Sequence, residues 1–112
     1  MNSTQQIGNL GNDPEVKYLD NDKGTCICNF SIAVPVYDKR KNEDVPNWIS
    51  CKAIGKNAEN IGEYFKKGHK IGITGELRND QWEKDGVKHS KTYILVSSFD
   101  FLTKKEGATG QQ

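Results

Sequence analysis

The 112-residue sequence has little cysteine, proline or methionine and no long apolar run. It contains three cysteines, three prolines and one methionine, and its longest uninterrupted apolar run covers residues 93–96. That run is too short to cross a bilayer, which takes about 20 apolar residues. Residues 1–10 also lack the basic and apolar regions of a secretory signal peptide. We therefore expect neither a membrane protein nor an exported one.

The odd number of cysteines argues against a disulfide framework and favours reduced thiols in a cytosol. Cys26 and Cys28 fall on one face of an expected strand, and together with Cys51 and His69 they could be considered as zinc ligands. A Cys-x-Cys pair without a second close pair is weak support for zinc. Buried free thiols are the better interpretation, and we expect no metal and no cofactor.

Neither sign of charge dominates, since the sequence has 16 Lys and Arg and 15 Asp and Glu, which gives a net charge of +1. A polyanionic partner would therefore have to be held by a local patch of charge. The hydrophobic fraction is only 34%, but ten aromatic residues can still furnish a small core. We expect one domain over residues 1–103 and a short disordered tail over residues 104–112.

Alternation of apolar and polar residues predicts a chain built mostly of β-strands. Strands are expected over residues 5–19, 25–36, 45–55, 70–77 and 91–102. The first is expected to break near Asp13 and Pro14. The fourth is expected to turn Ile71, Ile73 and Leu77 inward. The last is apolar on both faces, so we expect it to be covered on two sides.

One segment, residues 58–67, has the three- and four-residue apolar spacing of an amphipathic helix. Asn57 suits the N-cap and Gly68 the C′ position of this helix. Gly62 inside it costs about 1 kcal/mol relative to alanine. The face expected to be buried consists of Ala58, Ile61, Tyr64 and Phe65.

Turn residues separate these elements. Turns are expected over residues 20–24 and 38–44, and Asp85-Gly86 is expected to form a hairpin turn. The resulting order is three strands, one helix and two strands. This is the element order of a five-stranded OB-fold barrel with its helix between the third and fourth strands. We therefore expect an all-β fold with one short helix.

Three aromatic residues fall outside the expected core. Strand alternation turns Trp48 outward, because its neighbours Ile49 and Cys51 face inward. Tyr37 shares its face with polar residues of the second strand, and Trp82 lies among polar residues of the hairpin. Cations accompany these rings at Lys52, Lys56, Arg78, Lys84, Lys88 and Lys91.

Rings interleaved with cations suit single-stranded nucleic acid, because unpaired bases stack on the rings while ammonium groups follow the phosphates. The same rings could instead form a second small core or fill a contact with a partner protein or another subunit, since interfaces are also enriched in Trp and Tyr. An RNA-binding or primosome accessory role stays open on the same fold. The run Lys39-Arg40-Lys41 is balanced by three acidic residues in its loop and is interpreted as a solvated turn.

An enzyme is not expected. Neither His69 nor His89 has a nearby nucleophile or a recognisable triad signature. The sequence contains no Walker loop, and no paired carboxylates stand in an apolar setting.

Several short segments of the sequence are more informative about function than any single residue, because they occur together in a fixed order and spacing. They cover residues 8–18, 29–34, 48–60, 63–68 and 75–78, followed by Trp82. With these segments, residues 7–102 closely resemble the bacterial and phage-type single-stranded DNA-binding protein family. The resemblance implies an OB-fold homotetramer that wraps single-stranded DNA without strict sequence specificity. It also implies a role in protecting that DNA during replication, recombination and repair.

The resemblance also assigns roles to particular side chains. The stacking aromatics of the family fall on Trp48 and Trp82, and by a looser match on Tyr37, because the loop after Val36 varies in length. Ile54 departs from the family pattern, which often has an aromatic residue there. An apolar contact or a weaker stacking surface is expected at that position.

The end of the sequence departs from the family as well. Many bacterial members continue through a Gly-rich linker to an acidic tip that recruits replication and repair proteins, whereas this sequence reaches Gln112 without an acidic run. Either the chain has been shortened or it is a compact form of the kind that a phage or mobile element carries. Recruitment of such proteins is left open. The expected location is the cytoplasm of a bacterial cell or phage-infected host, in association with DNA.

Overall fold

The computed structural model describes residues 1–19 and 24–102. These residues form β1 (Thr4–Leu10), β2 (Glu15–Tyr18), β3 (Cys26–Asp38), β4 (Glu43–Ile54), α1 (Lys56–Tyr64), β5 (Lys70–Lys84) and β6 (Val87–Phe101). The break expected near Asp13 and Pro14 separates β1 from β2, so these two correspond to the expected first strand. Most of the turn expected over residues 20–24, the domain boundary and the tail lie outside the described residues.

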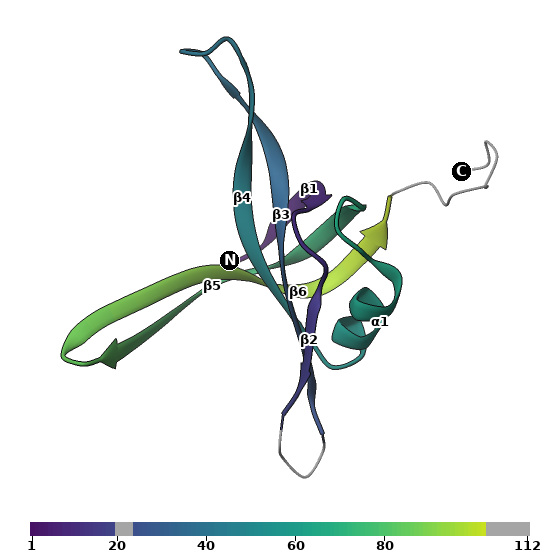
Figure 1. The fold of residues 1–112 in the computed structure, drawn as a ribbon, viewed down its shortest axis with the longest axis vertical. Coiled ribbons are helices and arrows are strands. Elements are labelled where there is room, and N and C mark those ends of the chain that lie inside the picture. The colour runs from purple at the N-terminus through teal and green to yellow at the C-terminus, as the bar shows by residue number, and fades with distance from the viewer. Residues whose placement is uncertain (20–23, 103–112) are drawn as a thin grey trace.

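The strands close into a barrel (Figure 1). β5 lies between β1 and β6, β6 pairs with β4, β4 pairs with β3, and β1 pairs with β3 to complete the ring. These pairings are antiparallel except that of β4 with β6, where Cys51 lies beside Ile94 in a parallel ladder. With β1 and β2 counted as one broken strand, the barrel has five strands and α1 follows the third. The expected OB-fold is confirmed.

One face of each long strand fills the barrel. Along β3, Cys28, Phe30 and Ile32 are buried while the residues between them are only partly covered. The same period of two places Cys51 and Ala53 of β4 inside. The core draws on five strands, the helix and the residue after it: Leu10, Cys26, Cys28, Phe30, Ile32, Cys51, Ala53, Ala58, Ile61, Phe65, Ile71, Ile73, Ile94 and Val96.

All three cysteines are buried free thiols, as the sequence predicts. Burial raises the pKa of Cys51 to about 12, and burial together with the charge of Cys26 raises the pKa of Cys28 to about 11. These two thiols stay protonated near neutral pH, and a thiol in that form is a poor nucleophile or metal ligand. His69 is engaged elsewhere, since its Nδ1 accepts a hydrogen bond of 3.0 Å from the Lys66 N–H. Across the described residues, no three His, Cys, Asp or Glu side chains are grouped as a metal site requires.

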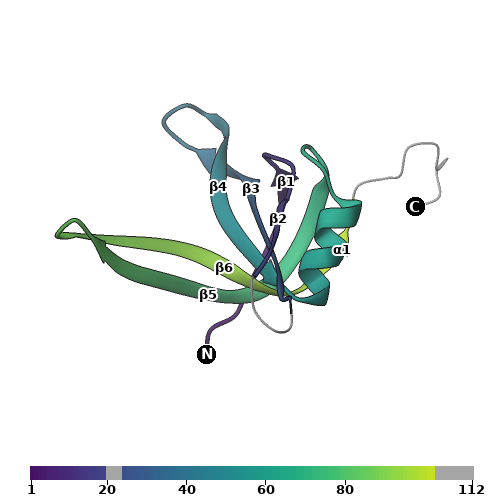
Figure 2. The same ribbon diagram turned by 60° about the horizontal axis from the view of Figure 1, so that its bottom comes forward.

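Two hairpins project from the barrel in different directions (Figures 1 and 2). β3 and β4 continue to a hairpin closed by residues 39–42, and β5 and β6 form a longer arm that ends at the Asp85-Gly86 turn. Asp85 and Gly86 have φ of 54° and 77°, as a two-residue turn of the type I′ kind requires. The expected turn is confirmed, and the strands that flank it are longer than the sequence predicts.

The prediction that Leu77 faces inward is wrong, because its side chain is 52% exposed. β1 pairs with β5 only as far as Gly75, so Leu77 lies beyond the closed part of the barrel. There the Asn2 side chain takes the place of β1 as the hydrogen-bond partner of β5. Its Nδ2 donates to the Leu77 carbonyl at 2.8 Å, and its Oδ1 accepts from the Leu77 N–H at 2.9 Å. Coverage of the expected last strand, residues 91–102, on two sides is also limited, since Phe101 at the end of β6 and Leu102 after it are exposed.

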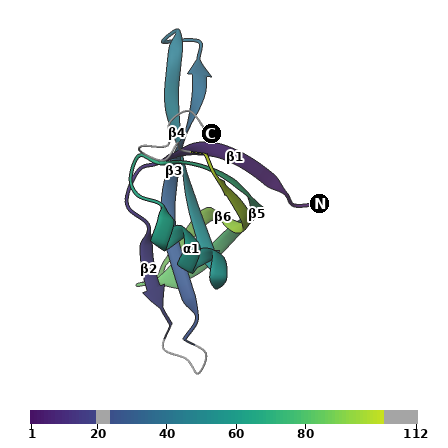
Figure 3. The same cartoon turned by 90° about the vertical axis from the view of Figure 1, so that its right-hand side faces the viewer.

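The helix α1 packs against β3, β4 and β2 (Figure 3). Ala58 and Ile61 are buried on its inner face, as predicted, and so is Phe65 directly after it. Tyr64 is 56% exposed, so its predicted burial is wrong. The helix ends at Tyr64, and the extended backbone of Phe65, with φ −110° and ψ 148°, turns the chain so that Phe65 alone points into the core.

The ends of the helix also differ from the prediction. α1 begins at Lys56, after Gly55 with φ of 75° and no side-chain cap. Asn57 therefore lies inside the first turn, where its Nδ2 donates to the Ser97 carbonyl at 3.1 Å. Gly68 follows the helix by several residues, in a turn where its φ is 90°. Neither Asn57 nor Gly68 caps the helix.

Gly62 has a packing reason that the sequence did not reveal. A Cβ on this glycine would stand 2.4 Å from Cγ2 of Val16 on β2. Gly62→Ala should therefore lower the free energy of unfolding by about 1 to 3 kcal/mol, because overpacking outweighs the better helix propensity of alanine. With Val16→Ala already present, the same substitution should instead stabilise by up to about 1 kcal/mol. Urea denaturation of the four chains measures both effects, and an equal effect in the two backgrounds would contradict the contact.

Candidate nucleic-acid interface

Trp48 projects from the outer face of the β3–β4 pair, as strand alternation predicts. The two strands pair without a register shift, so Trp48 lies opposite Ala33, and Lys52 lies opposite Asn29. The indole is 59% exposed. The unbroken register also keeps Tyr37 on this outer face, nearer the tip of the hairpin.

The chain just after β1 lies beneath the Trp48 ring. A Cβ on Gly11 would stand 2.3 Å from Cζ3 and 2.9 Å from Cη2 of the indole. Gly11 itself is fixed by a hydrogen bond of 2.9 Å from its N–H to the Ser31 carbonyl. The ring is therefore backed on one side by main chain, although most of it stays open to solvent.

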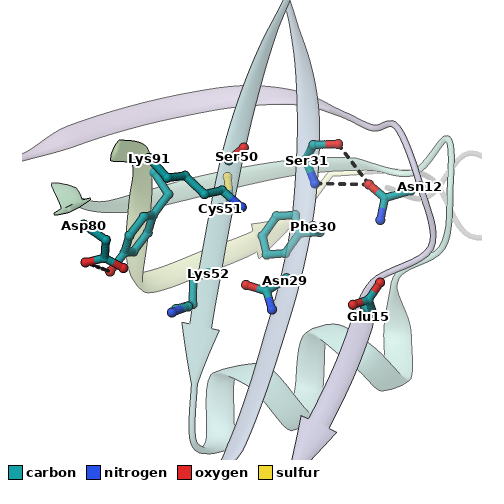
Figure 4. A pocket seen from close by; sticks show the side chains of 11 residues that line it. Asn12, Glu15, Asn29, Phe30, Ser31, Ser50, Cys51, Lys52, Asp80 and Lys91 are labelled. Carbon is teal, nitrogen blue, oxygen red and sulfur yellow. Dashed lines mark hydrogen bonds between the residues drawn. The ribbon is translucent and has the colours of Figure 1, made fainter. Parts of the chain in front are cut away.

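A groove of about 400 Å³ lies along the same pair of strands that carries Trp48 (Figure 4). It lies between the outer face of β3–β4, the start of β2 and the base of the β5–β6 arm. Ser50, two residues beyond Trp48 on β4, is part of its wall. The lining consists of Asn12, Glu15, Asn29, Phe30, Ser31, Ser50, Cys51, Lys52, Asp80, Lys91 and Tyr93.

Some polar groups of this groove are engaged and others are free. The Asn12 Oδ1 accepts hydrogen bonds from the Ser31 N–H at 3.2 Å and from the Ser31 hydroxyl at 2.9 Å, which fixes the β1–β2 connection to β3 (Figure 4). Within the described chain, the side chains of Asn29 and Ser50 have no such partner. Free amide and hydroxyl groups at this position can donate and accept hydrogen bonds with a ligand.

The sequence predicts only Lys52 and Lys91 among the residues that line this groove, and Tyr93 is the aromatic residue that it missed. Its ring is only 9% exposed, and the Lys52 Nζ lies 5.1 Å from the ring centroid. Its hydroxyl donates to Asp80 Oδ1 at 3.3 Å. Burial, with the charge of Asp80 second, raises the pKa of Tyr93, so the phenol stays protonated. A signal was present: the Asp85-Gly86 turn sets the hairpin register and places Tyr93 opposite Arg78.

The β5–β6 arm carries the second indole. Register places Trp82 and Lys84 on the same face of the arm as Asp80, Lys91 and Tyr93, which line the groove. Trp82 is 47% exposed and lies opposite His89 on the neighbouring strand. The two rings stack, with centroids 5.5 Å apart and an interplanar angle of 19°.

Other residues predicted for the site lie away from the groove. Lys88 projects from the opposite face of the arm, and Lys56 is the first residue of α1. Ile54 is exposed at the end of β4, opposite Ile27. Tyr37 is exposed near the hairpin tip, where its hydroxyl donates to Asn42 Oδ1.

The charge of the site is nearly balanced. The groove lining contains two cations, Lys52 and Lys91, and two anions, Glu15 and Asp80. On the arm, Arg78 forms an exposed ion pair of 3.4 Å with Glu76. Such an exposed pair contributes at most about 1 kcal/mol. Attraction for a polyanion is therefore modest, and ring stacking has to supply much of any binding energy.

Residues 1–19 and 24–102 contain no helix with the length and apolar character needed to cross a bilayer.

The family model described as the single-strand binding protein family matches residues 1–102. Single-stranded DNA-binding protein 1 of Synechocystis sp. is 42% identical over 107 residues, which cover 94% of this chain and 86% of the relative. The single-stranded DNA-binding protein of Thermosynechococcus vestitus is 34% identical over 94% of this chain and 85% of its own length. That of Clostridium perfringens is 34% identical over 96% and 69%. The chain therefore belongs to the single-strand binding protein family.

Proposed function

We propose that the protein binds single-stranded DNA without strict sequence specificity, as a binding protein and not as an enzyme. One observation carries the proposal: a groove lined by Lys52 and Lys91 has an exposed indole on each of its two strand pairs, Trp48 and Trp82. Unpaired bases stack on such rings whatever their identity, because every base has a π-face. The names of the relatives, which are single-stranded DNA-binding proteins, support the same function.

In this proposal the strand follows the outer face of β3–β4 and passes onto the β5–β6 arm. Bases stack on Trp48 and Trp82, with Tyr37 as a third ring and Ile54 as an apolar contact. Lys56 and Lys88 meet phosphates only where the strand bends around α1 or the arm, since they lie outside the groove. The cations proposed for phosphate contacts are Lys52, Lys56, Arg78, Lys84, Lys88 and Lys91.

The biological role follows from the family resemblance. A homotetramer in the cytoplasm of a bacterial cell or phage-infected host would coat single-stranded DNA and protect it during replication, recombination and repair. Light scattering of the purified protein measures the number of subunits.

Titration with oligo(dT) tests the proposed function. Tryptophan emission should be strongly quenched on binding, because the rings that stack on bases are the only two tryptophans of the sequence. The logarithm of affinity should fall with the logarithm of salt concentration at a slope of about −2 if only the three ammonium groups on the groove side, Lys52, Lys84 and Lys91, contact phosphates, and of about −4 if all six proposed cations do.

Unchanged emission and no complex at low salt would reject DNA binding. Competition by oligo(U) as strong as by oligo(dT) would favour RNA as an equal ligand. Rings that are buried in an oligomer and do not respond to either polymer would favour a protein-interaction module.

Gly11→Ala should displace the Trp48 ring, because the added Cβ occupies the space of the indole. We expect about 1 kcal/mol weaker binding to oligo(dT), since the ring can no longer stack in the same place. The backbone of Gly11 is not among those with positive φ, so the fold should be retained. In a Trp48→Ala background the substitution should leave affinity unchanged, and further weakening there would contradict this role of Gly11.

A further inference from the structure

The arm presents its tryptophan in an unusual setting. Trp82 and His89 are directly opposed in the third residue pair from the Asp85-Gly86 turn. This turn closes the β5–β6 hairpin, which projects from the barrel (Figure 1). No core residue surrounds the indole there, since residues 81–90 are exposed throughout. Across the described residues, the His89 imidazole is the one ring stacked on it, at 5.5 Å and 19°.

From this geometry we propose that His89 is a positioning residue for DNA binding: it covers one face of Trp82 and holds the other face ready for a single base. The inference rests on the proposed function and deepens it. An exposed indole on a two-stranded arm can adopt several rotamers, and ordering such a side chain on binding costs about 0.5 to 1.5 kcal/mol. A neighbouring ring that already fixes the indole removes part of this cost.

The stack also limits how many bases this tryptophan can accept. With one face covered by the imidazole, a base has access to the opposite face, so the site takes one base and not a sandwich of two. The flanking charges on the same face of the arm are Asp80 and Lys84 on β5 and Lys91 on β6. Lysines near the ring can already contact phosphates. What sets His89 apart from them is that its imidazole stacks on Trp82.

Affinity for a fluorescently labelled oligo(dT) tests the role through variants of His89. His89→Ala should weaken binding about two- to tenfold, because Trp82 must then be ordered by the DNA. His89→Phe should restore wild-type affinity within about twofold, because a ring without charge can still stack. Ser90→Ala, on the other face of the same strand, should have no effect and serves as the control.

A double-mutant cycle separates positioning from direct contact. In a Trp82→Ala background, His89→Ala should change affinity by less than about twofold. An undiminished loss in that background, or failure of His89→Phe to restore affinity, would overturn the proposal in favour of a direct contact of the imidazole with DNA.

A measurement without DNA keeps this proposal separate from the proposed function. With Trp48→Phe, Trp82 is the single tryptophan, and its time-resolved anisotropy reports motion of the indole. His89→Ala should increase that motion and His89→Phe should not. Unchanged motion in His89→Ala would overturn the positioning role even if DNA binds, whereas absence of DNA binding by the wild-type protein would reject the function and leave this result standing.

Discussion

Replacing both Trp48 and Trp82 by alanine is expected to abolish most of the affinity for oligo(dT). Each stacked base contributes about 1 to 3 kcal/mol, so the double variant should lose about 2 to 6 kcal/mol. The loss should be close to additive, because the two rings lie on different strand pairs and have different partners, Gly11 and His89. Anisotropy of a labelled oligonucleotide measures it, since no tryptophan is left to report binding.

The structure indicates that this loss will not come from unfolding. Trp48 and Trp82 are 59% and 47% exposed, and neither belongs to the core. The free energy of unfolding should therefore change by less than about 1 kcal/mol, as measured by urea denaturation. Tyr64→Ala is the matched control, because it removes an exposed ring on α1 that does not line the groove. Equal affinity of the double variant and the wild type would remove stacking as the source of binding.

The balance of charge explains why the rings should dominate. Lys52 and Lys91 share the groove with Glu15 and Asp80, and the whole chain has a net charge of only +1. A binder that relied on phosphate contacts alone would need a larger excess of cations. Carboxylates beside the DNA path weaken attraction for the backbone but leave the stacking of bases on Trp48 unaffected. A rise in salt concentration should therefore weaken DNA binding less than replacement of Trp48 and Trp82 does.

The fold could be predicted from the sequence where a short-range rule determined it. The period of two placed Phe30 and Ile32 inside and Trp48 outside, and the Asp85-Gly86 pair marked a turn with φ values that few other residues adopt. These features depend only on neighbours along the chain. The order of strands and helix then sufficed for the OB-fold.

Predictions failed where burial depended on contacts distant in sequence. Leu77 continues the inward parity of its strand, but β1 begins at Thr4, opposite Gly75, and so leaves Leu77 uncovered. Tyr64 fits the apolar face of α1, but the helix stops there and Phe65 takes the buried position. Gly62 indicated a less stable helix, but a residue without a side chain is needed there because Val16 of β2 packs closely against it.

The residues of the candidate site were likewise predicted in part and missed in part. Its exposed rings were found because alternation or polar neighbours set them apart from the core. Tyr93 was missed because it stands in an apolar run and is nearly buried, although its ring borders the groove and faces Lys52. Only the register of the arm, counted from its turn, could have placed it opposite Arg78. The contacts of Trp48 with Gly11 and of Lys52 with Tyr93 join segments distant in sequence, so no short-range rule predicts them.

Phe65→Ala is expected to cause the largest loss of stability of any single substitution considered. The ring is 1% exposed and packs against Phe99 and Phe101, with centroids 5.7 Å and 4.5 Å away. It joins the end of α1 to β6, so its removal leaves a cavity between helix and barrel. Loss of a buried phenylalanine costs about 3 to 5 kcal/mol. This is a large part of the roughly 5 to 15 kcal/mol that stabilises a typical domain.

Urea denaturation at a fixed protein concentration measures the effect, with Tyr64→Ala as control because the neighbouring ring is exposed. The control should change the free energy of unfolding by less than about 0.5 kcal/mol. If Phe65→Ala does not fold, Phe65→Leu keeps the test open, since it fills much of the cavity and should lose only about 1 to 2 kcal/mol. A Phe65→Ala chain that unfolds at the same urea concentration as Tyr64→Ala would show that the docking of α1 contributes little to the barrel. Because Phe65 does not line the groove, the folded fraction of each variant should bind oligo(dT) with wild-type affinity.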